Sequence, residues 1–309
     1  MTSDRTLVDV RALQIHPLHN ELLSELRRRA TSASGLFPEL WVAPFDTVTS
    51  TMDVARELHG GRALLASVAE PIGATEPRCS IDASRSTTAP IAVVALTQDR
   101  GRGRNDRWWN SRAGEGMYAT LILGIDRPIS DIRGLPLAIG VGVLRGVREL
   151  GGDARLKWPN DLWTIDEAGA PTGKLAGVLV ESWASGDGQT VSIGIGLNLT
   201  PSSDQLPFPR ATLEESAGRG VRYELAVTTV LSACCGALEE FLCRGLEVLR
   251  TEWEQQSITR NRQVRGIHGG KEIVGRALGL EAHGGLRILP DGADLEIVLH
   301  SNEISLVQF

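Results

Sequence analysis

The sequence predicts an α+β protein that ends in a small all-β domain. Apolar, β-branched runs at residues 91–96 and 118–123, each bounded by turn residues, are typical of buried strands. Patterns typical of helices occur at residues 136–150 and 223–253. Within residues 262–309, short alternating runs are broken by glycine-containing turns, as in a small β-barrel of SH3-like size. The order of these segments indicates an α+β core followed by a β-barrel.

The composition of the 309-residue chain narrows the functional classes. Hydrophobic residues make up 42% of it, which is enough for a sizeable core, and the formal net charge is −6. This mildly acidic balance argues against general nucleic-acid coating and against a basic membrane-surface helix. The longest uncharged apolar run, residues 134–144, is too short to span a bilayer, and no signal-peptide pattern opens the chain. We therefore expect a cytoplasmic protein with reduced cysteines and with neither DNA nor membrane partners.

The N-terminal elements follow from local signals. Residues 20–30 form one short amphipathic pattern, which is too little for a three-helix DNA-binding domain. Residues 41–48 are expected to form a strand, after which Ser50 caps a helix that ends at Gly60. Residues 70–90 are rich in Pro, Ser, Thr and Gly, and we expect them to form a long surface loop.

The remaining expected elements are a capped helix start, further strands of the core and the strands of the barrel. Thr212 and Glu215 match a capping box ahead of the long helix at residues 223–253. Further strands are expected in the core at residues 155–158, 175–181 and 190–197, and in the barrel at residues 272–277, 286–289, 295–299 and 304–309.

A loop rich in arginine and glycine carries the first chemical signal. The segment from Gln98 to Ser111 lies between two expected strands and holds Arg100, Arg102, Arg104 and Arg107 with Gly101 and Gly103. Glycine lets backbone N–H groups approach an anion, and guanidinium is planar, multi-donor and always charged. Such a loop suits a clamp on carboxylate and phosphate oxygens. By itself it also fits an exposed loop without a ligand, or a patch for single-stranded nucleic acid.

Lysine is scarce, and its positions are informative. Of the 32 basic residues only three are lysines, Lys157, Lys174 and Lys271. Lys157 ends a strand and is followed at a turn by Asn160 and Asp161, whereas Lys174 heads an apolar strand. A lysine there is costly without an anionic partner, and arginine cannot replace a compact ammonium that fits against a carboxylate and a phosphate. Lys174 is therefore a candidate anion-binding residue.

Together these segments resemble the biotin protein ligase family. The matching pieces occur in the family's order: Ser50-Thr51-Met52, residues 98–111, residues 157–161, residues 174–181, residues 194–198 and residues 303–306. The resemblance implies a class II aminoacyl-tRNA-synthetase-like (biotin–lipoate ligase) catalytic core, with a mixed sheet flanked by helices, and a C-terminal SH3-like β-barrel. The expected domains are an N-terminal helical extension at 1–40, the catalytic domain at 41–257 and the barrel at 258–309.

The resemblance also implies an activity. A chain of this kind is a stand-alone biotin–[acetyl-CoA-carboxylase] ligase without the DNA-binding domain. It activates biotin as biotinyl-5′-AMP with ATP and Mg²⁺, and it transfers the biotin to one lysine of a biotin carboxyl carrier protein domain. Biotin, ATP and this carrier domain are the implied partners, and the family's motifs assign no residue to a resident metal.

Residue roles carry over from the family's motifs to the matching positions. The biotin-binding positions are Ser50, Thr51, Met52, Gln98, Arg102, Gly103, Arg104 and Lys174. The nucleotide-binding positions are Arg107, Trp109, Asn160, Gly177 and Asn198. The implied catalytic residues are Arg104, Lys174 and Asp161. Lys174 contacts the carboxylate and phosphate oxygens, and Asp161 positions the acceptor lysine.

The chain departs from the family's pattern at several places, among them Arg100, which stands where a small residue is common, and the long loop at residues 70–90. Met52 stands where many relatives have asparagine, so a contact there is made by the backbone or is lost. Asn105 and Asp106 interrupt the usual Arg-x-Gly-Arg pattern of the loop. Because Asn and Asp tolerate the left-handed conformation that glycine would supply, we expect the turn to survive.

Two alternative functions fit part of the pattern. A lipoate or octanoate ligase or transferase shares the fold class, but it typically carries Arg-Arg followed by Gly-Gly-Gly, where this chain has Gly-Arg-Gly-Arg. A non-catalytic nucleic-acid-binding module could use the Arg/Gly loop, although it lacks the aromatic platforms expected beyond Trp108 and Trp109.

Overall fold

The structure, a computed structural model, divides into two compact units. It describes residues 40–60, 70–72, 90–185, 188–202, 204, 209–300 and 304–307, so the helix expected at residues 20–30 lies outside the described residues. Unit 1 comprises the described parts of Met1–Asp126, Leu179–Leu199 and Tyr223–Thr228. Unit 2 comprises those of Arg127–Val178, Thr200–Arg222 and Thr229–Phe309.

Unit 1 is built on a mixed sheet. Its strands are β1 (Leu40–Val48), β2 (Glu70–Ile72), β3 (Ile91–Gln98), β4 (Gly116–Ile125) and β8 (Gly188–Asn198), in the order β2-β1-β3-β4-β8, followed by residues 179–185 of β7 (Pro171–Ser185). β1 and β3 are parallel, whereas the β3–β4 and β4–β8 pairs are antiparallel. The strands expected at residues 41–48, 91–96, 118–123 and 190–197 are thereby confirmed.

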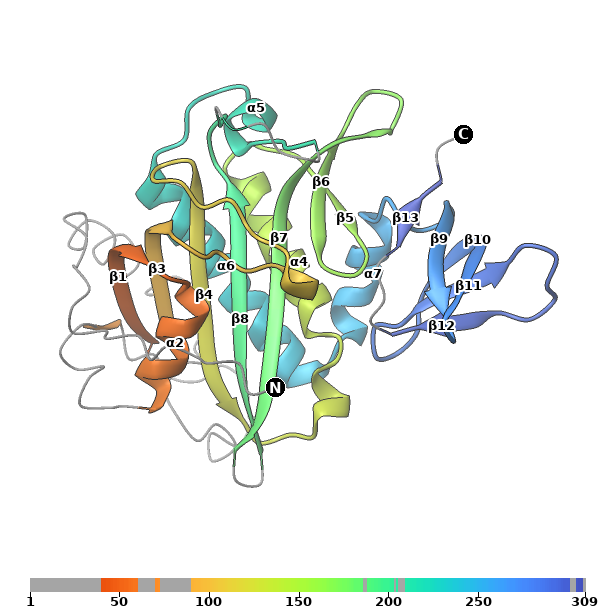
Figure 1. The fold of residues 1–309 in the computed structure, drawn as a ribbon, viewed down its shortest axis with the longest axis horizontal. Helices are drawn as coiled ribbons and strands as arrows, with labels where there is room; N and C mark the ends of the chain where they lie inside the picture. The colour runs from red at the N-terminus through yellow and green to blue at the C-terminus, as the bar shows by residue number, and fades with distance from the viewer. Residues whose placement is uncertain are drawn as a thin grey trace. The chain divides into compact units, whose positions relative to one another are not determined.

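One helix covers the centre of this sheet. α2 (Thr51–Gly60) packs against β3, β4 and β8, and it begins directly after Ser50, as expected (Figure 1). The carbonyl of Ser50 accepts hydrogen bonds from the backbone N–H groups of Asp53 and Val54, at 3.1 and 3.2 Å. Val54 and Leu58 are buried in a cluster with Phe45 and strand residues, and each large side chain buried in this way contributes about 1.5–3 kcal/mol. The β1–α2 junction is therefore fixed in place.

Unit 2 combines a small antiparallel sheet with helices. The sheet contains β5 (Arg155–Lys157), β6 (Asp161–Ile165) and residues 171–178 of β7. The helices are α4 (Leu135–Glu149), α5 (Leu213–Ala217), residues 229–244 of α6 (Tyr223–Arg244) and α7 (Glu247–Gln255). A Cβ on Gly142 would lie 2.8 Å from the Cα of Cys234, so glycine lets α4 approach α6 closely. The expected capping box of Thr212 and Glu215 begins α5.

Helix α6 satisfies the length and apolarity of a membrane span. It has 22 residues, but 67% of its most apolar window is buried inside the protein, as in the core helix of a globular protein.

The C-terminal residues form the expected all-β domain. β9 (Gln263–His268), β10 (Lys271–Leu280), β11 (Leu286–Pro290), β12 (Ile297–Leu299) and β13 (Ser305–Leu306) make an antiparallel sheet in the order β12-β11-β10-β9-β13 (Figure 1). Trp158, which is buried, ties the end of β5 to this domain. Its indole N–H donates to the carbonyl of Gly284 at 3.0 Å, and its backbone N–H donates to Thr259 Oγ1 at 3.1 Å.

Two expectations for the elements were wrong, and two strands were missed. Residues 70–72 at the start of the expected loop form an edge strand, where Pro71 is tolerated. The helix expected over 223–253 is divided at Gly245, whose φ of 74° is left-handed and ends α6. Strands β6 and β9 were not expected.

Two site residues also differ from their expected positions. Lys174 does not head its strand but lies inside β7, which begins at Pro171. Asp161 does not lie in the turn but is the first residue of β6.

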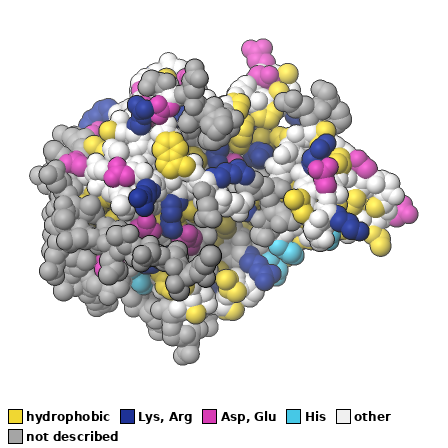
Figure 2. All heavy atoms as spheres, in the orientation of Figure 1, with side chains coloured by type: hydrophobic (Ala, Val, Ile, Leu, Met, Phe, Trp, Pro, Cys, Tyr) yellow, Lys and Arg dark blue, Asp and Glu magenta, His cyan; other side chains and the backbone are white. Residues whose placement is uncertain are grey.

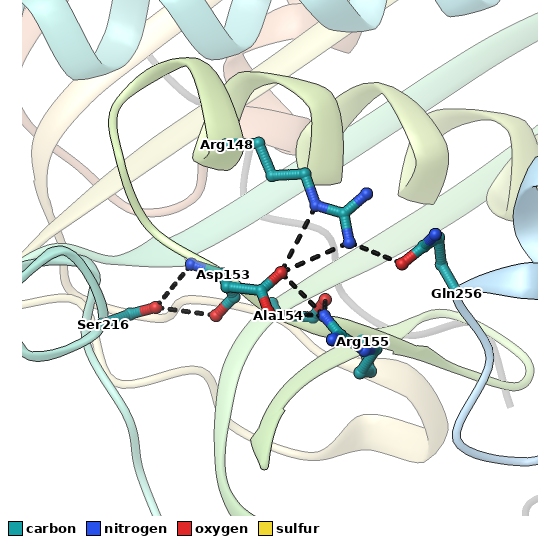
Figure 3. A network of polar contacts seen from close by, with 6 residues as sticks. All are labelled: Arg148, Asp153, Ala154, Arg155, Ser216 and Gln256. Atoms are coloured by element: carbon teal, nitrogen blue, oxygen red, sulfur yellow. Dashed lines mark hydrogen bonds and ion pairs between the residues drawn. The ribbon is translucent and has the colours of Figure 1, made fainter. Parts of the chain in front are cut away.

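A polar network joins the C-terminal end of α4 to β5 (Figure 3). Asp153 lies 3.3 Å from Arg148 Nη2 and 2.6 Å from Arg155 Nη1. Its backbone N–H and carbonyl bond to the hydroxyl of Ser216 at 2.8 and 2.6 Å, and Arg148 also donates to Gln256. The network therefore links α4, β5, α5 and the residue that follows α7.

Candidate active site

The predicted biotin-binding residues of unit 1 meet at the β1–α2 junction. Ser50, Thr51 and Met52 are buried there, and Gln98 at the end of β3 is 8% exposed. Gln98 Oε1 accepts from the backbone N–H of Thr51 at 2.9 Å and from its hydroxyl at 3.1 Å. The structure thus brings Thr51 and Gln98, 47 residues apart, into direct contact.

Two residues that the sequence did not single out extend this contact. Thr120, inside β4, donates to Thr51 Oγ1 at 2.8 Å. Gln98 Nε2 donates to Ser111 Oγ at 2.8 Å, and Ser111 donates to the carbonyl of Trp109 at 3.0 Å. Thr120 and Ser111 are 0% and 2% exposed. One signal was available for Thr120, which is polar within an apolar strand.

Met52 makes an apolar contact at the position where the resemblance to the family suggested asparagine in many relatives. A Cβ on Gly194 of β8 would lie 2.9 Å from Met52 Sδ, so the thioether lies directly over this glycine. Met52 therefore contributes apolar contact here, in line with the loss of a side-chain hydrogen bond.

The Arg/Gly loop is an ordered turn. Arg102 and Trp108 form an antiparallel bridge, and the N–H of Gly103 donates to the carbonyl of Arg107 at 2.7 Å. Between them, Arg104–Asp106 is a 3₁₀ turn in which Asn105 has a φ of 55°. The expectation that the turn survives without glycine is confirmed, because asparagine takes up the left-handed conformation.

Two carboxylates hold the guanidinium of Arg102 in place. Arg102 Nη2 lies 3.0 Å from Glu181 Oε2 and 3.5 Å from Asp53 Oδ1. The same oxygen of Glu181 lies 3.0 Å from Arg56 Nη2, and the Arg56 guanidinium stacks 4.5 Å from the ring centroid of Trp183. Glu181, for which the sequence predicts no role, anchors the loop to β7.

Two of the predicted nucleotide-binding residues of unit 1 lie on or against β8. The indole of Trp109 covers Gly196, where a Cβ would lie 2.4 Å from Trp109 Cε2. Asn198, at the end of β8, is 6% exposed. Arg104 is partly exposed and Arg107 exposed, both at the turn of the loop.

The remaining predicted residues meet in unit 2. Lys174 Nζ lies 2.7 Å from Asp161 Oδ1, and the two side chains are only 20% and 18% exposed. Asp161 pairs with Gly177 across β6 and β7. Asn160 is fixed to β7 at Val178, because its Nδ2 donates to the Val178 carbonyl at 2.6 Å and its own carbonyl accepts from the Val178 N–H at 2.9 Å.

The described residues also show how surface charge and possible metal ligands are distributed. In Figure 2, basic and acidic side chains of the described residues are interspersed over the face drawn. Within the described residues, no group of three or more His, Cys, Asp or Glu could hold a metal ion.

Comparison with known proteins places the chain in a family. Residues 80–198 match the Biotin/lipoate A/B protein ligase family, and residues 259–307 match the Biotin protein ligase C terminal domain. A biotin–[acetyl-CoA-carboxylase] ligase of Paracoccus denitrificans is 30% identical over 62% of this chain and 77% of its own length. This chain belongs to the biotin protein ligase family.

Other relatives support the family assignment and show how much of each chain the similarity covers. The bifunctional ligase/repressor BirA of Salmonella typhimurium is 34% identical over 206 residues, which are 65% of this chain. The chain spans 62% of the length of that relative. A biotin protein ligase from Aquifex aeolicus in complex with biotin and ATP superposes with a TM-score of 0.63 at 23% identity, over 86% of this chain and 99% of that one. The expected biotin–lipoate ligase fold is thereby confirmed, whereas the domain boundaries at residues 40 and 257 stay predictions.

Proposed function

We propose that this protein is a cytoplasmic ATP-dependent ligase. It activates biotin as biotinyl-5′-AMP and transfers it to a lysine of a biotin carboxyl carrier protein domain. The observation that carries the proposal is the buried contact between Thr51 and Gln98 at the β1–α2 junction. Buried amide and hydroxyl groups need hydrogen-bonding partners, and a neutral ureido ring offers them where a charged group would not.

The same contact favours biotin over lipoate. The dithiolane ring of lipoate offers only sulfur atoms, which are weak acceptors, so a buried amide would lose hydrogen bonds when it binds that ring. A site built to bond a polar group rejects an analogue without it by about 10⁴-fold or more. The family matched by residues 80–198 includes both ligand classes, so Gln98 is the residue whose chemistry separates them.

Cationic side chains are assigned to the activation step, in which biotin reacts with ATP. A carboxylate oxygen of biotin attacks the α-phosphorus of ATP, and pyrophosphate leaves with its electron pair. Negative charge gathers at that centre, and we assign Lys174, Arg102 and Arg104 to its stabilisation. Mg²⁺ enters as the complex of ATP, whose phosphate oxygens hold it with water. Trp109, Arg107, Asn160, Gly177 and Asn198 are assigned to the nucleotide.

The transfer step uses the mixed anhydride. The amine of the carrier lysine attacks the biotinyl carbonyl, an amide bond forms, and AMP leaves. We assign Asp161 to the positioning of that amine. The ordered turn of the Arg/Gly loop supports a role in shielding the anhydride from water, since its glycine and asparagine residues allow it to fold tightly.

A transfer assay tests the proposal. The purified chain is incubated with biotin, ATP, Mg²⁺ and a biotin carrier domain, and intact-mass spectrometry follows the carrier. We expect one biotinyl group on one lysine, and none without ATP or when that lysine is replaced by arginine. Lipoate in place of biotin gives the second arm. A lipoylated carrier, or an unmodified one in every arm, overturns the proposal.

A further inference from the structure

The hydrogen-bond chain through Gln98 has a fixed direction, which follows from one backbone donor. The backbone N–H of Thr51 can only donate, so the atom that faces it at 2.9 Å must be the oxygen of Gln98. That oxygen cannot donate, so the Thr51 hydroxyl, 3.1 Å away, donates to it. A hydroxyl has one hydrogen, and Thr120 must therefore donate to Thr51.

The direction continues on the other side of the amide. With its oxygen turned to Thr51, Gln98 directs Nε2 to Ser111 Oγ at 2.8 Å. Ser111 Oγ accepts this hydrogen bond, and the Ser111 hydroxyl donates a hydrogen bond to the carbonyl of Trp109. The donors thus run from Thr120 through Thr51, Gln98 and Ser111 to Trp109. We call these five residues the relay.

The relay ends against a glycine of the Arg/Gly loop. A Cβ on Gly101 would lie 2.4 Å from the Trp109 carbonyl oxygen and 2.5 Å from Ser111 Oγ. The backbone N–H of Trp109 also donates to the carbonyl of Gly101 at 2.9 Å. The loop and the relay are therefore in close contact at Gly101, where no residue with a Cβ would fit without a shift of Trp109 or Ser111.

We propose that Thr120 and Ser111 are positioning residues that set the hydrogen-bond polarity of Thr51 and Gln98. The relay leaves unused one lone pair of Thr51 Oγ1 and, among the described residues, the second N–H of Gln98 Nε2. One acceptor beside one donor complements a ring edge on which an N–H adjoins a C=O, as in a cyclic urea or lactam. This inference rests on the proposed function and adds two residues and a ligand polarity to it.

Ligand analogues test the polarity. Desthiobiotin keeps the N–H and C=O edge of biotin, and we expect it to bind within about tenfold of biotin, since it loses only apolar contact. Protonated 2-iminobiotin places a donor where the carbonyl oxygen was and so opposes the Gln98 N–H. We expect its affinity to be at least about 100-fold below that of biotin. Equal affinity for biotin and 2-iminobiotin at neutral pH overturns the polarity.

Variants of Thr120 and Ser111 test the positioning role. Thr120→Val removes the donor at constant shape, and Thr120→Ser restores it. We expect Thr120→Val and Ser111→Ala to weaken biotin binding about 5- to 10-fold by calorimetry, with ATP affinity unchanged and Thr120→Ser within about twofold of the parent. Thr228→Val is the matched control, because its hydroxyl, equally buried in α6, bonds to the carbonyl of Glu224 outside the relay. Unchanged biotin affinity in both folded variants, Thr120→Val and Ser111→Ala, overturns the proposal.

A spectroscopic readout separates this proposal from the proposed function. The side-chain amide signals of Gln98, assigned by ¹⁵N NMR in the ligand-free protein, report the relay without any substrate. We expect them to shift in Thr120→Val and Ser111→Ala and to stay in place in Thr228→Val. If the parent fails to bind biotin but these signals shift, the relay stands and the ligase assignment falls. If the signals stay in place, the relay is wrong whatever the chain binds.

Discussion

The ammonium of Lys174 lies 2.7 Å from the carboxylate of Asp161, and both side chains are mostly buried. The register of β6 and β7 produces this contact, since it pairs Asp161 with Gly177 and Trp163 with Lys174. Lysine inside an apolar strand is costly without a counter-ion, and Asp161 supplies one. An incoming phosphate or carboxylate oxygen would compete with Asp161 for the same ammonium.

Replacement of Lys174 tests this competition. We expect Lys174→Ala to slow biotinyl-AMP formation at least about 100-fold, because it removes the cation that we assign to the reacting phosphate. Biotinyl-AMP formation should also be slow in Lys174→Arg, since the larger planar guanidinium does not fit where the compact ammonium of lysine does. The measurement is isotope exchange between pyrophosphate and ATP. Lys271→Ala, at the exposed first residue of β10, is the control, and parental exchange rates in Lys174→Ala would refute the assignment.

The contact of Trp109 with Gly196 gives a second prediction. In Gly196→Ala the new methyl group would lie 2.4 Å from the indole, which must move off β8. Overpacking of this kind costs about 1–3 kcal/mol, and we expect the KM for ATP to rise about tenfold with less effect on the affinity for biotin. Gly236→Ala in α6 is the control, because nothing lies within 4 Å of its added Cβ. An unchanged KM for ATP in Gly196→Ala would show that Trp109 does not touch the nucleotide.

Glu181 gives a third prediction through its ion pair with Arg102. Both side chains are about a third exposed, so the pair is worth less than about 1 kcal/mol. We expect Glu181→Gln to open the Arg/Gly loop more often and to speed tryptic cleavage there about two- to threefold in the ligand-free protein. Glu296→Gln, which breaks a similar pair with Arg287 elsewhere, should leave that cleavage rate unchanged.

Elements with local signals were predictable from the sequence. The β-branched run of β3, the capping box of α5 and the start of α2 each depend on neighbouring residues, and each forms where expected. The same holds for the left-handed Asn105, whose conformation follows from its short polar side chain. The resemblance to the family's motifs then predicted Thr51, Gln98, Lys174 and Asp161 as residues of the active site.

The features that could not be predicted depend on partners that are far away in the sequence. Lys174 lies inside β7 because the pairing with β6 extends the strand towards Pro171, and no local pattern marks that extension. Thr120 and Glu181 gain their roles from contacts across 69 and 79 residues. Polar side chains of this kind look like ordinary strand residues until the sheet brings their partners next to them.

The network around Asp153 predicts a dependence of stability on pH (Figure 3). Burial acts to raise the pKa of Asp153, but hydrogen bonds and positive charge from Arg155 and Arg148 outweigh it and lower the pKa below its usual 3.8. A carboxylate with a lowered pKa stabilises the fold at pH values above its unfolded pKa, and this contribution is lost as the pH falls through the folded pKa. We expect Asp153→Asn to reduce the free energy of unfolding at neutral pH, by less than about 1 kcal/mol because the side chain is more than half exposed.

Urea unfolding of the parent and of Asp153→Asn, at about pH 7 and about pH 3, measures this difference. The difference in the free energy of unfolding between the two proteins should shrink at the lower pH, where protonation of Asp153 begins to remove the charge that asparagine lacks. Arg155→Gln should produce a similar loss at neutral pH, and the double variant should lose less than the sum, because both changes remove the same ion pair. A gap that stays constant with pH would mean that the carboxylate charge does not stabilise this corner, and that Asp153 acts there through its backbone bonds to Ser216 alone.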